Sequence, residues 1–195
     1  MSRTTRFKLL YVGLLVVLGA LALIILSSLN WSYGAVAVVV VILLIPGRVQ
    51  GHFYRDLFKG RRLVEAGRYN DSIQHSERFL REVRRRPGLK RLIWFAGVIY
   101  TDDPEAMALS NIGVAHLEAG RFDAAETTLR EALRVDPEYP LPLYNLAVLF
   151  EASGKHEEAV GFFQNAAALG YQRDGFDQVV HRAGSILARI EGGVR

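Results

Sequence analysis

The sequence predicts an all-α protein, in which an N-terminal transmembrane helical hairpin precedes a short α-solenoid with a C-terminal capping helix. Three observations carry this prediction. Residues 9–29 form a run of 21 residues without a charge. The stretch EAGRYNDS at Glu65 returns as EAGRFDAA at Glu118, and in varied form as EASGKHEEA at Glu151. The glycines of the last two copies are 34 residues apart, a spacing typical of stacked helix pairs.

The first 50 residues predict a membrane anchor of two helices, about 9–29 and 33–48. At about 1.5 Å per residue the first run spans about 31 Å, enough to cross the hydrocarbon core of a bilayer. The second run, AVAVVVVILLI, is short for a full span, so a re-entrant or tilted second helix is the alternative. A cleaved signal peptide is disfavoured, because the first run is too long and a second apolar run follows it.

Basic residues lie at both outer ends of this anchor and not in the turn between its two helices. Three of them precede residue 9 and five lie between residues 48 and 62, whereas the turn between the two apolar runs carries none. Positively charged flanks stay in the cytoplasm. We therefore expect an integral membrane protein, in the inner or plasma membrane if the protein is bacterial, with both termini and the repeat domain cytoplasmic. The absence of cysteine fits a reducing compartment.

The remainder of the chain is predicted to consist of helix pairs. Aligned on their glycine turns, residues 51–86, 106–139 and 140–173 carry small or apolar residues at common offsets. The second and third segments match each other closely. The first is degenerate and basic, with Ser72 and Ser76 at positions that hold alanine and a large apolar residue in the other two.

These positions resemble the tetratricopeptide repeat (TPR), a family in which pairs of helices stack into a solenoid. The resemblance covers about half of the chain and implies a TPR-like α-solenoid that binds a peptide on its inner face. One helix pair cannot bury its apolar side alone, so neighbouring pairs must stack to form a core. Residues 174–195, in which charged residues alternate with an apolar helical stripe, are predicted to form a capping helix and tail.

The resemblance also implies a groove lined by the first helices of successive pairs. Asn111 and Asn145 share one repeat position, where an asparagine in related arrays bonds the peptide backbone, because an amide both donates and accepts. The alternative for each is a solvated helix position. Phe58 occupies this position in the first segment, and the basic residues that grip a free C-terminus in chaperone-binding members are not evident. The predicted groove residues are Ser110, Asn111, Val114, Leu141, Tyr144, Asn145 and Val148.

An apolar insertion, residues 87–105, separates the first and second segments, and its centre Leu92–Tyr100 carries no charge. One interpretation is an added helix packed on the repeats. The other is a helix that lies in the membrane interface, since about nine apolar residues cannot span a bilayer.

Charge is divided unevenly along the chain. Residues 47–91 contain 13 Lys and Arg against 5 Asp and Glu, a net charge of +8, while residues 92–195 contain 8 against 15, a net charge of −7. A basic block beside an anchor favours contact with anionic lipid, worth up to about 1 kcal/mol per well-placed charge. A solvated helix end is the plainer interpretation, and the anchor makes a nucleic-acid partner unexpected. The predicted membrane-surface residues are Arg84, Arg85, Arg86, Lys90, Arg91, Trp94 and Phe95.

No catalytic constellation is evident in the sequence. The five histidines lack metal-ligand spacing, and His116 lies at a packing position of the repeat. Asp103 before Pro104 is explained by helix capping. With no phosphate-binding loop or nucleophile motif, the sequence predicts no enzymatic activity, no metal and no cofactor.

The favoured function is therefore a membrane-anchored adaptor or scaffold that binds a protein or peptide partner at the cytoplasmic face of the membrane. Two alternatives stay open. One is a structural or lipid-organising protein that uses the basic block and the apolar insertion, and the other is a non-catalytic subunit of a membrane complex. The sequence predicts no particular oligomeric state.

Overall fold

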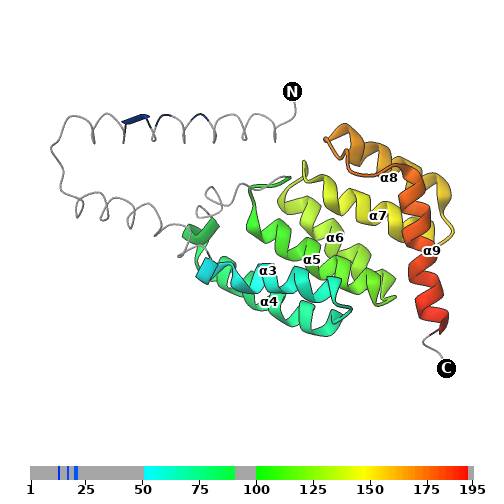
Figure 1. Cartoon of the computed structure of the whole chain (residues 1–195), viewed down its shortest axis with the longest axis horizontal. Helices are drawn as coiled ribbons and strands as arrows, with labels where there is room; N and C mark the ends of the chain where they lie inside the picture. The colour runs from blue at the N-terminus through cyan, green and yellow to red at the C-terminus, as the bar shows by residue number, and fades with distance from the viewer. Residues whose placement is uncertain (1–12, 14–16, 18–19, 22–50, 91–99, 193–195) are drawn as a thin grey trace.

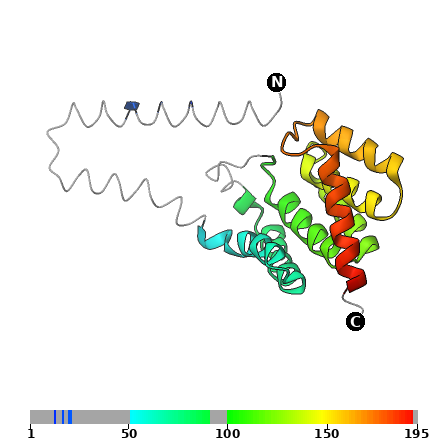
Figure 2. The same ribbon diagram turned by 45° about the vertical axis from the view of Figure 1, so that its right-hand side comes forward.

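The computed structural model describes residues 13, 17, 20–21, 51–90 and 100–192, and the regular secondary structure of these residues is helical (Figure 1). The helices follow one another in antiparallel pairs, and the last helix runs along the stack from the third pair toward the second (Figure 2). They are α3 (Arg55–Glu65), α4 (Tyr69–Arg85), α5 (Pro104–Glu118), α6 (Phe122–Val135), α7 (Pro140–Ala152), α8 (His156–Ala168) and α9 (Phe176–Gly192).

Most of the predicted anchor, residues 9–29 and 33–48, lies outside the described residues. Its four described residues, Gly13, Val17, Ala20 and Leu21, are helical and exposed. Within the part of the chain that the structure describes, no helix is both long and apolar enough to cross a bilayer.

The turns inside the three helix pairs share one geometry. Gly67, Gly120 and Gly154 have φ values of 71°, 73° and 75°, which an L side chain rarely adopts. In each turn the glycine N–H donates to the carbonyl three residues earlier, and the next N–H donates to the carbonyl five residues earlier. This is the hydrogen-bond pattern of the Schellman motif. The prediction that one repeated stretch encodes one repeated turn is therefore confirmed.

The two helices of a pair approach closely where a glycine faces the partner helix. A β-carbon added at Gly113 of α5 would lie 2.7 Å from Leu129 Cγ of α6. At the equivalent position of the first pair, a β-carbon at Gly60 would lie 2.3 Å from Ser76 Oγ. Ser72, fully buried, donates a hydrogen bond from Oγ to the Gly60 carbonyl at 2.8 Å. The two serines of the first segment thus pack around this glycine, where the second pair has Ala125 and Leu129.

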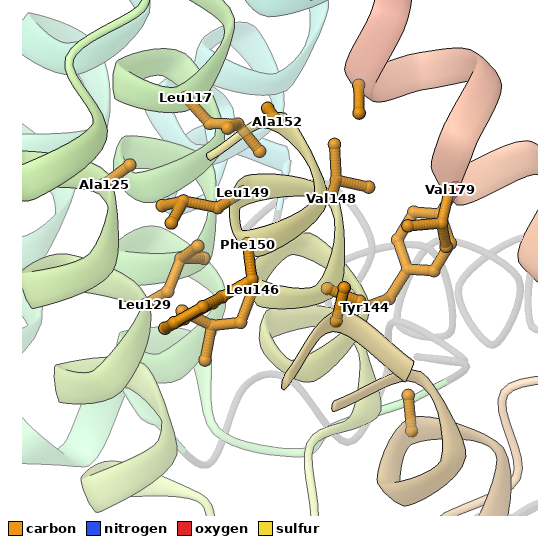
Figure 3. Close-up of a cluster of buried hydrophobic side chains, with 14 of the residues drawn as sticks. Leu117, Ala125, Leu129, Tyr144, Leu146, Val148, Leu149, Phe150, Ala152 and Val179 are labelled. Carbon is orange, nitrogen blue, oxygen red and sulfur yellow. The ribbon is translucent and has the colours of Figure 1, made fainter. Parts of the chain in front are cut away.

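Two apolar clusters hold the stack together. One joins the first pair to the second, with Tyr54, Leu57, Phe79, Leu80, Val83, Ala108, Leu109, Ile112 and Ala132 buried together. The other joins the second pair, the third pair and α9, and α7 lies at its centre (Figure 3). In this cluster Leu146 and Phe150 point toward α6, whereas Tyr144 and Val148 point toward α9. Of the predicted capping helix and tail, residues 174–195, the structure places a helix over 176–192, and its role as a cap stays a prediction.

The ends of the insertion are fixed to the stack, although its centre, residues 91–99, lies outside the described residues. On one side, Tyr54 Oη donates to the Leu89 carbonyl at 2.8 Å, and burial raises the pKa of Tyr54 to about 12. On the other side, Thr101 Oγ1 donates to Asp136 Oδ2 at 2.5 Å. Lys90 Nζ lies 2.9 Å from Asp103 Oδ2 and 2.7 Å from Glu105 Oε2, so two ion pairs close the insertion at its base.

The predicted start of α5 is confirmed. Asp103 is the N-cap, and its Oδ1 accepts hydrogen bonds from the backbone N–H groups of Glu105 and Ala106 at 2.8 and 3.4 Å. Pro104 follows at the first helical position, where a missing N–H costs nothing.

Candidate functional site

The face predicted to line the groove is built from one stripe on α5 and one on α7. Residues four apart lie on the same side of a helix. Ser110, Val114 and Glu118 therefore form the stripe of α5. Their counterparts 34 residues later, Tyr144, Val148 and Ala152, form that of α7. We call these six residues the inner face.

The chain's own C-terminal helix covers the α7 half of the inner face. Val179 and Ile186 of α9 are fully buried, and Ala183 is nearly so, in the same cluster as Tyr144 and Val148 (Figure 3). The burying residues of α9 follow the spacing i, i+4, i+7, which is that of an amphipathic helix laid on an apolar surface.

Glu118 fixes α9 across the inner face by charge. Its Oε1 accepts from Arg182 Nη2 at 2.6 Å, and its Oε2 accepts from Arg189 Nη2. The Glu118 side chain is only 13% exposed, so these charge-assisted bonds are shielded from water. Near the end of α9, a β-carbon at Gly120 would lie 2.7 Å from Ile190 Cδ1. The helix therefore reaches from the third pair to the turn of the second.

The two asparagines predicted to bond a peptide have partners within the chain. Asn111 Nδ2 donates to the Leu57 carbonyl of the preceding pair at 3.2 Å. Asn145, 5% exposed, donates to the Leu141 carbonyl at 2.7 Å and accepts from Arg182 Nη1 at 2.9 Å. Both amides thus donate to backbone carbonyls of the protein itself. Binding of an external peptide by these asparagines stays a prediction.

The other predicted groove residues divide into covered and accessible ones. Ser110, Tyr144 and Val148 are buried, and the Tyr144 ring stacks on that of Tyr171 at a centroid distance of 4.5 Å. Val114 and Leu141 keep part of their surface exposed. The accessible part of the predicted groove therefore lies on α5 and at the start of α7.

The basic residues predicted to meet a membrane surface are partly neutralised. Arg84 lies 2.8 Å from Glu105 and 2.7 Å from Glu131, and Lys90 lies 2.7 Å from Glu105. Burial alone would raise the pKa of Glu105, but the hydrogen bonds from Lys90 and Arg84 outweigh it and lower the pKa. Arg84 therefore joins the first pair to the second, whereas Lys90 binds carboxylates at the other end of the insertion.

The remaining members of that predicted set have different surroundings. Arg86 pairs with Glu82 at 3.1 Å, and Arg85 is exposed. Arg91, Trp94 and Phe95 lie outside the described residues. Whether the set meets lipid stays a prediction.

Titratable groups of the described residues offer little chemistry. In residues 51–90 and 100–192, no group of three or more His, Asp and Glu side chains is arranged to hold a metal ion. Burial and the nearby Arg121 lower the pKa of His116, whose Nδ1 is buried without a hydrogen-bond partner. His116 is therefore neutral near pH 7 and packs against its neighbours, as its position in the repeat predicts.

A comparison with protein families gives the last observation. Residues 110–173, from the middle of α5 into the loop between α8 and α9, match the family described as tetratricopeptide repeat. The two helix pairs that follow the insertion are similar to that family. Members of this family are typically non-catalytic scaffolds, and the match suggests a protein-interaction adaptor. A comparison with curated proteins found no match.

Proposed function

We propose that the protein is a membrane-anchored adaptor whose inner face binds a helical segment of a partner protein. The observation that carries this proposal is the seating of α9. An apolar stripe next to an acidic residue accommodates an amphipathic helix of this chain, so it has the chemistry to accept such a helix from a partner.

The residues that hold α9 describe the helix that would suit the inner face. It would carry small and branched apolar residues at i, i+4 and i+7, as Val179, Ala183 and Ile186 do. It would also carry a basic residue able to reach Glu118, as Arg182 does at i+3. In this proposal α9 and the partner compete for the α7 half of the inner face, while Val114 and Leu141 are accessible to both.

The membrane part of the proposal rests on the sequence. Residues 9–29 have no charge over 21 positions, and both flanks of the two apolar runs are basic. Val17 and Leu21, in the first run, expose 54% and 48% of their surfaces, and a bilayer would cover such side chains. We propose that these runs form the anchor and that the helix pairs face the cytoplasm. Retention of the chain in alkali-washed membranes tests the anchor, and its release would contradict it.

Competition with α9 gives the sharpest test of the adaptor function. The chain contains no cysteine, so a single introduced cysteine can carry a photo-crosslinker in native membranes. We would label Val114→Cys on the inner face and, as a control, Thr127→Cys on the exposed side of α6. A partner protein is expected to crosslink from position 114 and not from position 127.

Two further arms identify the inner face as the binding site. Arg182→Ala/Arg189→Ala removes both cations that bind Glu118, so it should loosen α9 and increase the crosslink. A synthetic peptide of residues 176–192 should reduce it, and a peptide in which Val179, Ala183 and Ile186 are replaced by serine should not. Equal crosslinking from positions 114 and 127, or no response to the α9 peptide, would contradict the proposal.

The lipid-organising alternative is less well supported by the geometry. Two of the charges on which it relied, Arg84 and Lys90, have carboxylate partners within the chain.

A further inference from the structure

The exposed side of α3 carries three basic residues in one row. Arg55, Lys59 and Arg62 are spaced i, i+4 and i+7, which places them within an arc of about 60° on a helix that turns about 100° per residue. All three are exposed, and among the described residues none of them has an ion-pair or hydrogen-bond partner. We call these residues the basic stripe.

Acidic residues do not neutralise the basic stripe, because those of the first pair are engaged elsewhere. Asp56 Oδ1 lies 2.7 Å from His75 Nδ1, on the side of α3 that faces α4. Glu65 pairs with Arg61 at 3.3 Å. On α4, Asp71, Glu77 and Glu82 pair with Arg68, Arg81 and Arg86. Each carboxylate of residues 51–90 thus has a partner outside the basic stripe, so none of them neutralises the positive charge of the stripe.

An aromatic side chain borders the basic stripe. Phe58 lies three residues after Arg55 and four before Arg62, and 39% of its surface is exposed. A row of cations beside an exposed phenyl ring suits the boundary between lipid headgroups and acyl chains, where cations meet phosphates and the ring enters the apolar layer.

The position of α3 in the chain indicates which anionic surface it meets. The second apolar run ends at Ile45, only ten residues before Arg55. Ten residues span at most about 36 Å when fully extended and about 15 Å when helical. If the apolar runs are the proposed anchor, the stripe is held near a bilayer surface whether or not it binds.

The charges of the stack point the same way. α3 and α8 lie at opposite ends of the stack of pairs (Figure 1), and the first turn of α8 carries the exposed carboxylates Glu157 and Glu158. An anionic surface therefore attracts one end of the stack and repels the other.

We propose that the basic stripe, together with Phe58, docks on the anionic surface of the membrane that holds the anchor, and so orients the helix pairs on that membrane. This inference rests on the proposed anchor but not on the proposed partner. It differs from the surface that the sequence predicted, since Arg84 and Lys90 are bound to carboxylates and α3 carries the free charges.

The test uses the full chain reconstituted in vesicles of phosphatidylcholine, with or without phosphatidylglycerol. Ala66 is exposed and continues the row of the stripe at i+4 from Arg62. A fluorophore on Ala66→Cys should be quenched by a lipid-borne quencher more strongly in the anionic vesicles. The same fluorophore on Gln164→Cys of α8, at the other end of the stack, should respond equally little in both.

Two matched variants separate the basic stripe from net charge. Arg55→Gln/Lys59→Gln/Arg62→Gln should abolish the difference between the two kinds of vesicle at position 66. Each lost charge is expected to lower the ratio of docked to undocked chains by up to about fivefold. Arg121→Gln/Arg134→Gln/Arg173→Gln removes the same charge from exposed arginines that follow the insertion in the chain and should leave the difference intact. High salt should weaken docking.

The outcomes distinguish this inference from the proposed anchor. Equal quenching at position 66 in neutral and anionic vesicles, or equal effects of the two triple variants, would overturn the proposal that the basic stripe docks on anionic lipid. Failure of the chain to float with neutral vesicles would overturn the anchor. If such a chain still floats with anionic vesicles and the stripe variant does not, the stripe binds anionic lipid even though the proposed anchor is wrong.

Discussion

The first and third helix pairs share one turn and differ in almost everything that their outer sides present. α3 packs on α4 and α5 with one side and exposes the basic stripe on the other. α7 is apolar nearly all round, with Leu146 and Phe150 facing α6 and Tyr144 and Val148 facing α9 (Figure 3). The glycine turn therefore specifies a helix pair, while the side chains outside the pair decide whether another helix can pack on it.

This contrast explains why α9 lies where it does. Without α9, the side of α7 that carries Tyr144, Val148 and Ala152 would expose an apolar stripe to water. Covering it is favourable by about 25 cal/mol per Å² of apolar surface removed from water. In the first pair the positions equivalent to Val148 and Ala152 hold the charged residues Arg61 and Glu65, which pair with each other while largely exposed to water.

The largest loss of stability is expected at Leu129. Ser76, which occupies the same repeat position in the first pair, is the residue for comparison. Leu129→Ala removes a fully buried side chain from beside Gly113 and should lower the free energy of unfolding by about 2–5 kcal/mol. Ser76→Ala removes a buried hydroxyl that has no hydrogen-bond partner, so it should change stability by less than about 1 kcal/mol, or increase it. Denaturant unfolding in detergent, followed by circular dichroism, measures both. Similar losses in the two variants would show that the pairs do not differ in this way.

A smaller effect is expected at the facing glycines. Gly113→Ala places a β-carbon 2.7 Å from the Leu129 side chain, and overpacking of this kind costs about 1–3 kcal/mol. Gly60→Ala overlaps only with the Ser76 hydroxyl, which can rotate away without losing a bond, while the Ser72 carbonyl oxygen at 3.4 Å stays at contact distance. The double variant Gly60→Ala/Ser76→Ala removes even that contact. It should be more stable than the parent by up to about 1 kcal/mol, because alanine favours a helix over glycine. Destabilisation by the double variant would contradict the geometry of the first pair.

Local features of this protein could be predicted from the sequence, whereas contacts between distant segments could not. The glycine turns and the Asp103 cap depend on residues within one turn of a helix, and all of them are confirmed. The partner of Asn111 is Leu57, 54 residues away, and periodicity alone does not identify it. The sequence indicates which side of α9 is buried, but not that this side covers Tyr144 and Val148. For the same reason, the sequence does not indicate that Glu131, 47 residues later, neutralises Arg84.

The attachment of α9 should respond to a change of one atom in Glu118. Glu118→Gln keeps the size of the side chain but removes the charge that binds Arg182 and Arg189, and bonds to charged groups are worth about 1.5–3 kcal/mol each in favourable settings. Amide hydrogens of α9 should therefore exchange about tenfold faster or more, while those of α3 and α4 are unchanged. The control is Glu158→Gln on the exposed side of α8. Unchanged exchange in α9 would mean that apolar contacts alone hold it.

The smallest effect concerns pH and the joint between the first two pairs. Hydrogen bonds from Lys90 and Arg84 lower the pKa of Glu105 in the folded protein below its ordinary value of 4.5. A carboxyl whose pKa is lowered by folding adds stability at pH values above its unfolded pKa, and this stability is lost as the pH falls through the folded pKa. Acid should therefore loosen α3 and α4 from α5 before it affects the contact of α7 with α8, which hydrogen exchange at a series of pH values resolves. In Glu105→Gln the acid-dependent part of this difference should disappear. If it persists unchanged, another carboxylate must join the first pair to the rest, and Glu131, the second partner of Arg84, is the residue to change next.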